Sequence, residues 1–247
     1  MSQLASEYFD RAAAILARIR ETQLEATDRA ADWCAASILA GRLVHLFGSG
    51  HSRIPVEEVF PRYGSFPGFH PMVELSLTYH NQVVGANGQR QAMFLERVPG
   101  LAEVILSNFV LDARDTAILF SATGGSVVTI EMAEGFARRG IRTVAVTAMS
   151  HAGRLAEVCD LAIDTCIPAG DAVIRVPGLE TPVSPVSTVA ASAVANAIKA
   201  EVAQRLTEAG QPPLVLTSSH LVGGERSAEL FEKAYDDYRR RIGVLYR

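Results

Sequence analysis

The stretch LFSATGGSVVTIEMAEGFARRG, residues 119–140, decides the fold class of this chain. It starts as an apolar run, breaks into Ser, Thr and Gly, and then resumes with apolar residues such as Val127, Ile130 and Ala133 at helical spacing. Gly140 stands where a glycine commonly ends a helix. The pattern therefore predicts a buried strand, a polar turn and an amphipathic helix, in that order.

The same pattern occurs about seventy residues earlier, in RLVHLFGSGHSRIPVEEVF at residues 42–60, with Phe47 and Phe120 in matching places. Further short apolar runs are DTAILFSA (115–122), RTVAVTA (142–148), LAIDTC (161–166) and PPLVLTSS (212–219). Continuous apolar runs that alternate with helical patterns are typical of βαβ units around a parallel sheet. We therefore predict an α/β protein with a central, mostly parallel sheet.

The rest of the chain fits around this core as one domain, residues 1–247. Residues 1–40 predict an N-terminal helical segment of one or two helices, 41–220 the α/β core, and 221–247 a C-terminal helix. The segment 61–100 is rich in turn residues, so we expect it to shape a site without building the core. GDAVIRVPG (170–178) predicts a short hairpin or edge strand.

The composition excludes several classes of protein. The chain has 247 residues, 49% of them hydrophobic and 20% charged, with a net charge of -4, so no basic footprint for nucleic acid is present. Its three cysteines form no CxxC pair, and the N-terminus lacks the basic and apolar regions of a signal peptide. The longest uncharged run, residues 181–198, contains two prolines, which argues against a membrane span. We expect a cytoplasmic protein with neither nucleic acid nor membrane as a partner.

The two polar turns are candidate anion sites. Backbone N–H groups at a helix N-terminus attract anions, and glycines such as Gly124 and Gly125 let the backbone approach a ligand closely. Singly, such residues more often serve as caps and turns, but two turns at the ends of predicted parallel strands favour a ligand site. The hydroxyls that could grip phosphate are Ser121, Thr123 and Ser126, and the turn itself contains no Lys or Arg, so we expect mainly neutral donors.

Nucleotide motifs do not fit. Arg53 stands where a dinucleotide fingerprint needs its third glycine, and no GKS or GKT of a phosphate-binding P-loop is present. No cofactor is therefore predicted.

Together, these stretches of the sequence resemble the SIS (sugar isomerase) domain. LFSATGGSVVTIEMAEGFARRGIRTVAVTA looks like its phosphate turn and following helix, HLFGSGHS like its earlier turn, and SPVSTVAASAVANAIKAEV like its closing helix. GHSRIPVEEVF, LERVPGLAEVIL and GDAVIRVPGLE are similar to a bacterial branch labelled putative phosphoheptose isomerase or sugar isomerase domain protein. The resemblance covers about residues 40–220.

The resemblance implies a flavodoxin-like three-layer sandwich that binds a sugar phosphate, as a homodimer or homotetramer with sites near subunit interfaces. It implies that Ser121, Thr123 and Ser126 grip the phosphate, with Ser52 and the pair Ser187 and Thr188 nearby. We therefore predict Ser52, Ser121, Thr123, Gly124, Gly125 and Ser126 as phosphate-binding residues, and Gly50, Ser187 and Thr188 as further substrate-binding residues. The stretch EEVFPRYGSF departs from the branch at Pro61 and Tyr63, where the sugar pocket is expected to differ.

Aldose–ketose isomerisation needs a base that moves a proton between C1 and C2. Glu57 and Glu58 fall in the helix after the first turn, about 100° apart, so only one can face the sugar. Phosphoheptose isomerases that resemble this chain place a functional side chain at the position of Glu58, which is our predicted base, with Glu57 as its rival. His51 is predicted to assist ring opening. Second-rank candidates, for which a solvated helical face or a salt bridge is the favoured alternative, are Glu96, Lys199 and Glu201. His80 and His220 have weaker claims, from predicted loops near possible edges of the site.

The sequence therefore predicts a phosphosugar isomerase that acts through an enediolate. His51, Glu58 and a third ligand could hold zinc, but no metal-ligand spacing supports this, so metal-independent function is predicted. An amino-sugar phosphate lyase, etherase or epimerase would use the same proton abstraction. A non-catalytic phosphosugar sensor is the alternative from another class.

Overall fold

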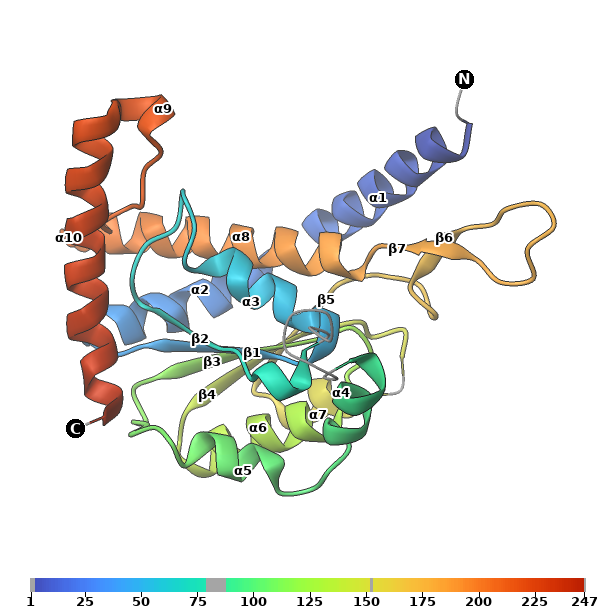
Figure 1. The fold of residues 1–247 in the computed structure, drawn as a ribbon, viewed down its shortest axis with the longest axis horizontal. Helices are drawn as coiled ribbons and strands as arrows, with labels where there is room; N and C mark the ends of the chain where they lie inside the picture. Colours follow the sequence, from blue (N-terminus) through green and yellow to red (C-terminus); the bar gives the residue numbers. More distant parts are fainter. Residues whose placement is uncertain (1–2, 79–87, 152, 247) are drawn as a thin grey trace.

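The computed structural model describes residues 3–78, 88–151 and 153–246. Its centre is a five-stranded sheet in the order β2-β1-β3-β4-β5, and all its neighbouring strands are parallel (Figure 1). The strands are β1 (Val44–Gly48), β2 (Phe69–Met72), β3 (Thr116–Ser121), β4 (Arg142–Thr147) and β5 (Leu161–Asp164). The prediction of an α/β protein with a mostly parallel sheet is confirmed.

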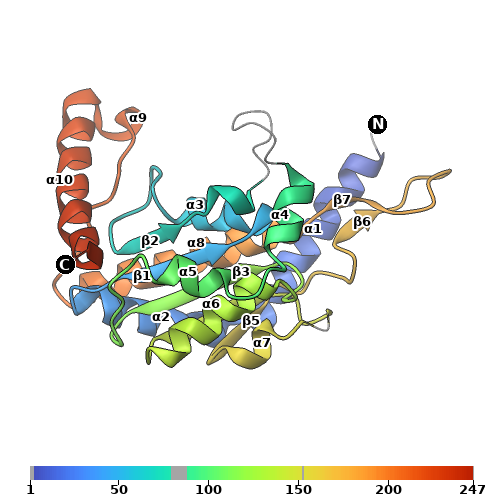
Figure 2. The ribbon, with the colours of Figure 1, turned by 60° about the horizontal axis from the view of Figure 1, so that its bottom comes forward.

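Helices cover both faces of this sheet, which explains why its strands read as continuous apolar runs. Alternate strand residues point to opposite faces, so Leu46 and Phe120 join one core cluster while Phe47 and Leu119 join the other. The first face is covered by α2 (Leu24–Leu39), α3 (Ile54–Val59) and α8 (Ser187–Glu208). The second face is covered by α5 (Leu101–Leu106), α6 (Val127–Arg138) and α7 (Leu155–Val158) (Figure 2).

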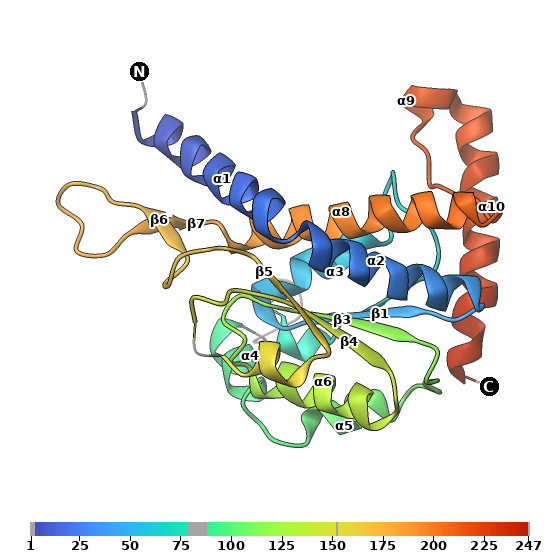
Figure 3. The ribbon, with the colours of Figure 1, turned by 180° about the vertical axis from the view of Figure 1, so that it is seen from behind.

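The remaining elements lie at the two ends of this sandwich. At one end, α1 (Gln3–Thr22) and the hairpin of β6 (Ala172–Ile174) with β7 (Val183–Pro185) extend away from the body (Figure 3). At the other end, α10 (Gly224–Ile242) runs across the edge of the layers. The predicted N-terminal helices, hairpin and C-terminal helix are thus present. The short elements are η1 (Gly50–Arg53), η2 (Leu75–Leu77), α4 (Gln89–Leu95), α9 (Ser219–Val222) and η3 (Gly243–Tyr246).

Two sequence predictions about strands are wrong. The run PPLVLTSS (212–219) does not form a strand. Its Leu216 makes two backbone hydrogen bonds with another segment: Gly64 N donates to Leu216 O, and Leu216 N donates to Ser65 O. Pro212 and Pro213 have no N–H with which to extend this pairing. Conversely, the turn-rich segment 61–100 was not expected to build the core, yet its residues 69–72 form the edge strand β2, because pairing with β1 overrides their local turn signals.

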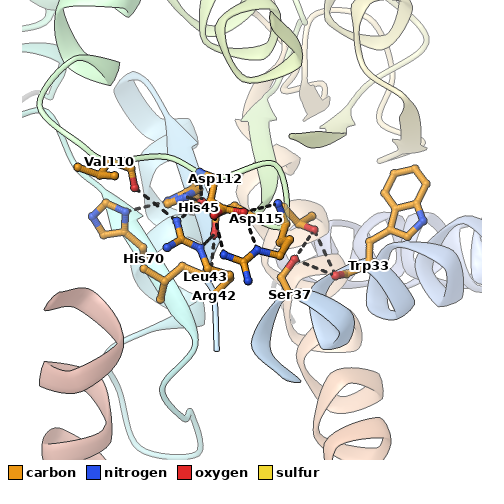
Figure 4. A network of polar contacts seen from close by, with 11 residues as sticks. Trp33, Ser37, Arg42, Leu43, His45, His70, Val110, Asp112 and Asp115 are labelled. Carbon is orange, nitrogen blue, oxygen red and sulfur yellow. Dashed lines mark hydrogen bonds and ion pairs between the residues drawn. The ribbon is translucent and has the colours of Figure 1, made fainter. Parts of the chain in front are cut away.

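A buried polar network lies at the amino-terminal ends of the strands (Figure 4). The two polar turns follow β1 and β3 at the opposite, carboxyl-terminal ends. The Arg42 guanidinium donates to both carboxylate oxygens of Asp115 at 2.9 Å, and His45 Nε2 lies 3.2 Å from the same carboxylate. The Nδ1 atoms of His45 and His70 are 3.0 Å apart. Each of these four side chains is nearly inaccessible, so the network satisfies charges that would be costly to bury alone.

None of the described helices combines the length and the apolar run that crossing a membrane requires.

Candidate functional site

The parallel pairing of β1 with β3 brings the two polar turns together. Gly48 pairs with Phe120 in the sheet. The two turns, residues 49–52 and 121–126, therefore begin side by side at the carboxyl-terminal ends of β1 and β3. Ala122 N donates to Ser52 Oγ at 3.3 Å, which ties one turn to the other. The cavity between them, of about 340 Å³, is lined by Ser49, His51, Ser52, Glu96, Arg97, Ser121, Ala122, Thr123, Gly125 and Ser126. Most of the predicted phosphate-binding residues therefore meet in one place.

A second, smaller crevice shares one wall with this cavity. It holds about 20 Å³ and is lined by His51, Ser52, Pro55, Phe120, Ser121, Ala122, Val146, Thr165, Ser187, Thr188 and Ala191. The predicted residues Ser187 and Thr188 thus reach the site from the first turn of α8. The Ser187 hydroxyl donates to Asp171 Oδ2 at 2.6 Å, so in this structure it joins α8 to the β6–β7 hairpin.

Three turn hydroxyls keep a proton to donate. Ser121 Oγ accepts from Gly124 N at 3.0 Å, and Thr123 Oγ1 accepts from Gly125 N at 3.4 Å. Ser52 Oγ likewise accepts from the turn, at Ala122 N. A hydroxyl has one proton besides its lone pairs, so each of these can hold the turn and still donate to an anion.

The N-terminus of α6 opens directly onto the cavity. Ser126 holds the N-cap position, but its side chain makes no capping hydrogen bond and lies 3.4 Å from Ser49 Oγ instead. Gly124 has a φ of +65°, a conformation that glycine adopts without strain. The first turn of this twelve-residue helix therefore presents its dipole to the cavity without a serine cap in the way.

Gly153, in the segment after β4, supports the back of the turn at residues 121–126. A Cβ atom at this position would lie 2.0 Å from Thr123 O and 2.4 Å from Gly124 C, so the two backbones pack without room for a side chain. Leu155 N also donates to Gly124 O at 3.1 Å. The sequence analysis assigned no role to Gly153, although a glycine in the stretch SHAGRL (150–155) could have indicated a close approach of two backbone segments.

Glu96 and Arg97 reach the cavity from the C-terminal end of α4, in the segment predicted to shape the site. Ser49 Oγ donates to Glu96 Oε2 at 2.9 Å, and Val128 N donates to Glu96 O at 3.0 Å. Arg97 is exposed, and within the part of the chain that the structure describes no ion pair is recorded for it. Glu96, a second-rank candidate from the sequence, thus supplies the cavity with a carboxylate. Arg97 supplies the positive charge that the turn at residues 121–126 lacks.

Glu58 and Glu57 lie outside the described lining of both cavities. Glu58 faces α8, where Asn196 Nδ2 donates to its Oε1 at 2.9 Å and Arg62 forms an ion pair with it. Burial acts to raise the pKa of Glu58, but the hydrogen bonds from Asn196 and Arg62 outweigh it and hold that pKa below its ordinary value. Glu57 is exposed and pairs with Arg53 at 2.5 Å.

The other candidate residues are dispersed. Lys199 Nζ donates to Glu58 O at 3.4 Å, and burial lowers the pKa of its ammonium group. Glu201 pairs with Arg205 at 2.6 Å, and His220 is exposed on α9. His80 lies outside the described residues. Gly50, with a φ of +56°, is buried within the first turn and brings His51 to the cavity wall.

Across residues 3–78, 88–151 and 153–246, no group of three or more His, Cys, Asp or Glu side chains is placed to hold a metal ion.

Comparison with known proteins identifies the family. A UPF0309 protein of Streptomyces griseus is 29% identical over 253 residues, covering 98% of this chain and 97% of the relative. The fold is similar to a phosphoheptose isomerase from Neisseria gonorrhoeae (TM-score 0.57, 12% identity, 80% of this chain and 96% of that chain). It is also similar to the Vibrio vulnificus NanR protein complexed with ManNAc-6P (TM-score 0.53, 11% identity, 96% and 70%). The SIS domain model matches residues 7–148, more than half of the 247 residues, and the chain therefore belongs to the SIS domain family.

Proposed function

We propose that this protein binds a sugar phosphate in the cavity between the two polar turns and interconverts its aldose and ketose forms. One observation carries the proposal: a phosphate-type turn and a carboxylate, Glu96, line the same cavity of about 340 Å³. This volume lies in the range of sites for small molecules.

The phosphate group is proposed to bind at residues 121–126. Ser52, Ser121 and Thr123 have hydroxyl protons to donate there, and the first turn of α6 supplies a positive dipole end. The Arg97 guanidinium on the same wall would add a charge-assisted hydrogen bond to a phosphate oxygen. Gly124 and Gly125, which have no side chains, would let the backbone of the turn lie close to the phosphate.

The reaction is proposed to use Glu96 as the base. Its carboxylate would take the proton from C2 of the open-chain aldose, leaving an enediolate, and would return that proton to C1 to give the ketose. His51 on the same wall would move the protons of the sugar oxygens as the ring opens and the enediolate forms. Carbon is oxidised at C2 and reduced at C1, so the step balances within the sugar.

Glu58, the base implied by family resemblance, is the competing assignment. Its carboxylate is one helical turn further along α3 than Pro55, which lines the small crevice, and it is held by Asn196 and Arg62. A sugar that extended along α8 rather than toward α4 would place its reacting carbons nearer to Glu58. Glu57, whose carboxylate is exposed, ranks below both.

The test starts with a thermal-shift panel of sugar phosphates and the matching free sugars. Stabilisation by a phosphate ester alone identifies the ligand class and a substrate candidate. Turnover and C2 proton exchange in heavy water are then measured for wild type, Glu96→Gln and Glu58→Gln. We expect Glu96→Gln to lower kcat by about a hundredfold or more, and Glu58→Gln to retain most of it.

Other outcomes decide against parts of the proposal. Loss of kcat in Glu58→Gln alone would transfer the role of base to Glu58. Binding without C2 proton exchange would show a phosphosugar sensor. Exchange accompanied by release of a substituent would show the lyase or etherase alternative.

We also propose that the protein works as a homodimer or homotetramer in the cytoplasm. In α1, which extends from the body, Phe9 is 70% exposed, and α1 has one buried residue, Ile19. A second copy would remove such apolar surface from water. Cys34, Cys159 and Cys166 are free thiols, as a reducing compartment favours. Light scattering after gel filtration measures the oligomer, and a monomer would contradict this part.

A further inference from the structure

Two serines at helix starts share an unusual feature in this structure. Ser49 precedes η1 and Ser126 precedes α6, and neither side chain makes the capping hydrogen bond that serine commonly provides there. Both side chains instead turn toward each other and toward the cavity. Their hydroxyls are therefore used for something other than helix capping.

The two hydroxyls form a directed chain that ends on Glu96. Ser49 has one hydroxyl proton, and it points to Glu96 Oε2 at 2.9 Å. An ionised carboxylate can only accept, so the Ser49 oxygen is left as an acceptor for the Ser126 hydroxyl, 3.4 Å away. The order of donation is thus Ser126 to Ser49 to Glu96.

Glu96 has a second link to the same place. Its backbone oxygen accepts from Val128 N, in the first turn of α6, at 3.0 Å. Ser49 itself is 8% exposed, so its hydroxyl competes little with solvent for the carboxylate. The carboxylate of a short helix, α4, is in this way fixed to the residues that flank the phosphate turn.

We infer that Ser49 is a positioning residue that holds Glu96 over the cavity, and that Ser126 leaves this chain when a phosphate group binds. This inference rests on the proposed function. A phosphate oxygen is a stronger acceptor than a neutral hydroxyl, and the 3.4 Å contact to Ser49 is long, so Ser126 gains by turning to the phosphate.

When Ser126 turns to the phosphate, the strength of the hydrogen bond from Ser49 to the Glu96 carboxylate changes. A hydroxyl that accepts a hydrogen bond donates a stronger one, so Ser49 holds the carboxylate less tightly once Ser126 has turned away. A phosphate group at one end of the ligand thus weakens the hydrogen bond from Ser49 to the Glu96 carboxylate at the other end, whereas a free sugar does not. The chain is a route by which the cavity discriminates a sugar phosphate from the sugar alone.

The test uses inorganic phosphate as the probe, with nuclear magnetic resonance of protein labelled at backbone amides and glutamate carboxyl carbons. The Glu96 signal is assigned by its loss in Glu96→Gln. In wild type, we expect phosphate to shift the amide signals of Gly124 and Gly125 together with the carboxyl signal of Glu96. In Ser49→Ala, we expect the amide shifts to remain and the Glu96 shift to fall to less than about half, since the charge of the ion still acts but the hydroxyl chain does not.

Ser49→Thr is the matched control, because it keeps the hydroxyl and should restore the Glu96 response. With a confirmed substrate, Ser49→Ala should lower kcat about tenfold with little change in KM, and Ser49→Thr should recover it. An equal Glu96 shift in wild type and Ser49→Ala would overturn the inference while leaving the phosphate site intact. No amide shift in wild type would instead overturn the proposed function, on which the inference depends.

Discussion

The Nδ1 atoms of His45 and His70 lie 3.0 Å apart, on neighbouring parallel strands whose register pairs these two residues directly. His45 Nε2, on the other side of its ring, lies 3.2 Å from the Asp115 carboxylate, and of the two facing Nδ1 atoms one donates while the other accepts. A further proton on His70 would have no acceptor within the pair.

The first prediction concerns acid stability. Burial, together with the charge of His45, lowers the pKa of His70 from 6.5 to about 3, although Asp115 acts in the opposite direction. The unfolded chain therefore binds a proton between these two values that the folded chain does not, and the free energy of unfolding falls as the pH falls from 6.5 toward 3. The slope from this one group is about 1.4 kcal/mol per pH unit.

Urea unfolding from about pH 7 to about pH 5 measures this slope, because carboxylates contribute mainly at lower pH. His70→Phe removes the titrating group and should flatten the curve over this interval. An unchanged slope in His70→Phe would refute the assignment.

The second prediction concerns the carboxylate at the centre of this network. Asp115 accepts from Arg42 through both oxygens and also from the backbone N–H groups of Leu43 and Asp112. Asp115→Asn leaves the buried Arg42 charge without its partner, so we expect a loss of about 3 to 5 kcal/mol in the free energy of unfolding. Glu229→Gln, which breaks an exposed pair with Lys233, should change stability little. Equal effects of the two substitutions in urea unfolding would contradict the prediction.

The third prediction concerns Gly153. A methyl group there would meet Thr123 O at 2.0 Å, so Gly153→Ala should displace the phosphate turn and weaken phosphate binding by about tenfold or more. Gly224→Ala is the matched control, because nothing lies within 4 Å of a Cβ at that position. Calorimetric titration with the best sugar phosphate measures both. Wild-type affinity in Gly153→Ala would show that the turn tolerates the shift.

The fourth prediction concerns Arg97. If its guanidinium pairs with the phosphate, Arg97→Gln should weaken binding of a sugar phosphate about tenfold to a hundredfold, and the loss should shrink at high salt. Arg240→Gln on α10, remote from the cavity, should leave affinity unchanged. Competition by inorganic phosphate measured in both variants separates a phosphate contact from a sugar contact. Equal phosphate affinity in wild type and Arg97→Gln would rule out the proposed pairing.

Much of the fold follows from local sequence patterns. The period of apolar residues separates strands from helices, and the glycine and hydroxyl turns at residues 48–52 and 121–126 mark where strands give way to helices. Strands buried on both faces need helices on both sides, which led to the parallel sheet that the structure confirms. The strand expected at 212–219 does not form, and the strand at 69–72 lies in a segment that was not expected to build the core, because strand pairing, unlike helix formation, depends on a distant partner.

The sequence by itself determined the α/β class, the two polar turns and the hydroxyl groups of the turn at residues 121–126. These features depend on the identities and conformational preferences of neighbouring residues. Only the tertiary structure decided which charged groups share the cavity with them. Glu96 and Arg97 come from α4, Gly153 from the segment after β4, and Glu58 turns to Asn196 on α8. Such contacts join residues far apart in the chain, and their distances are set by how helices and strands pack, which no local pattern records.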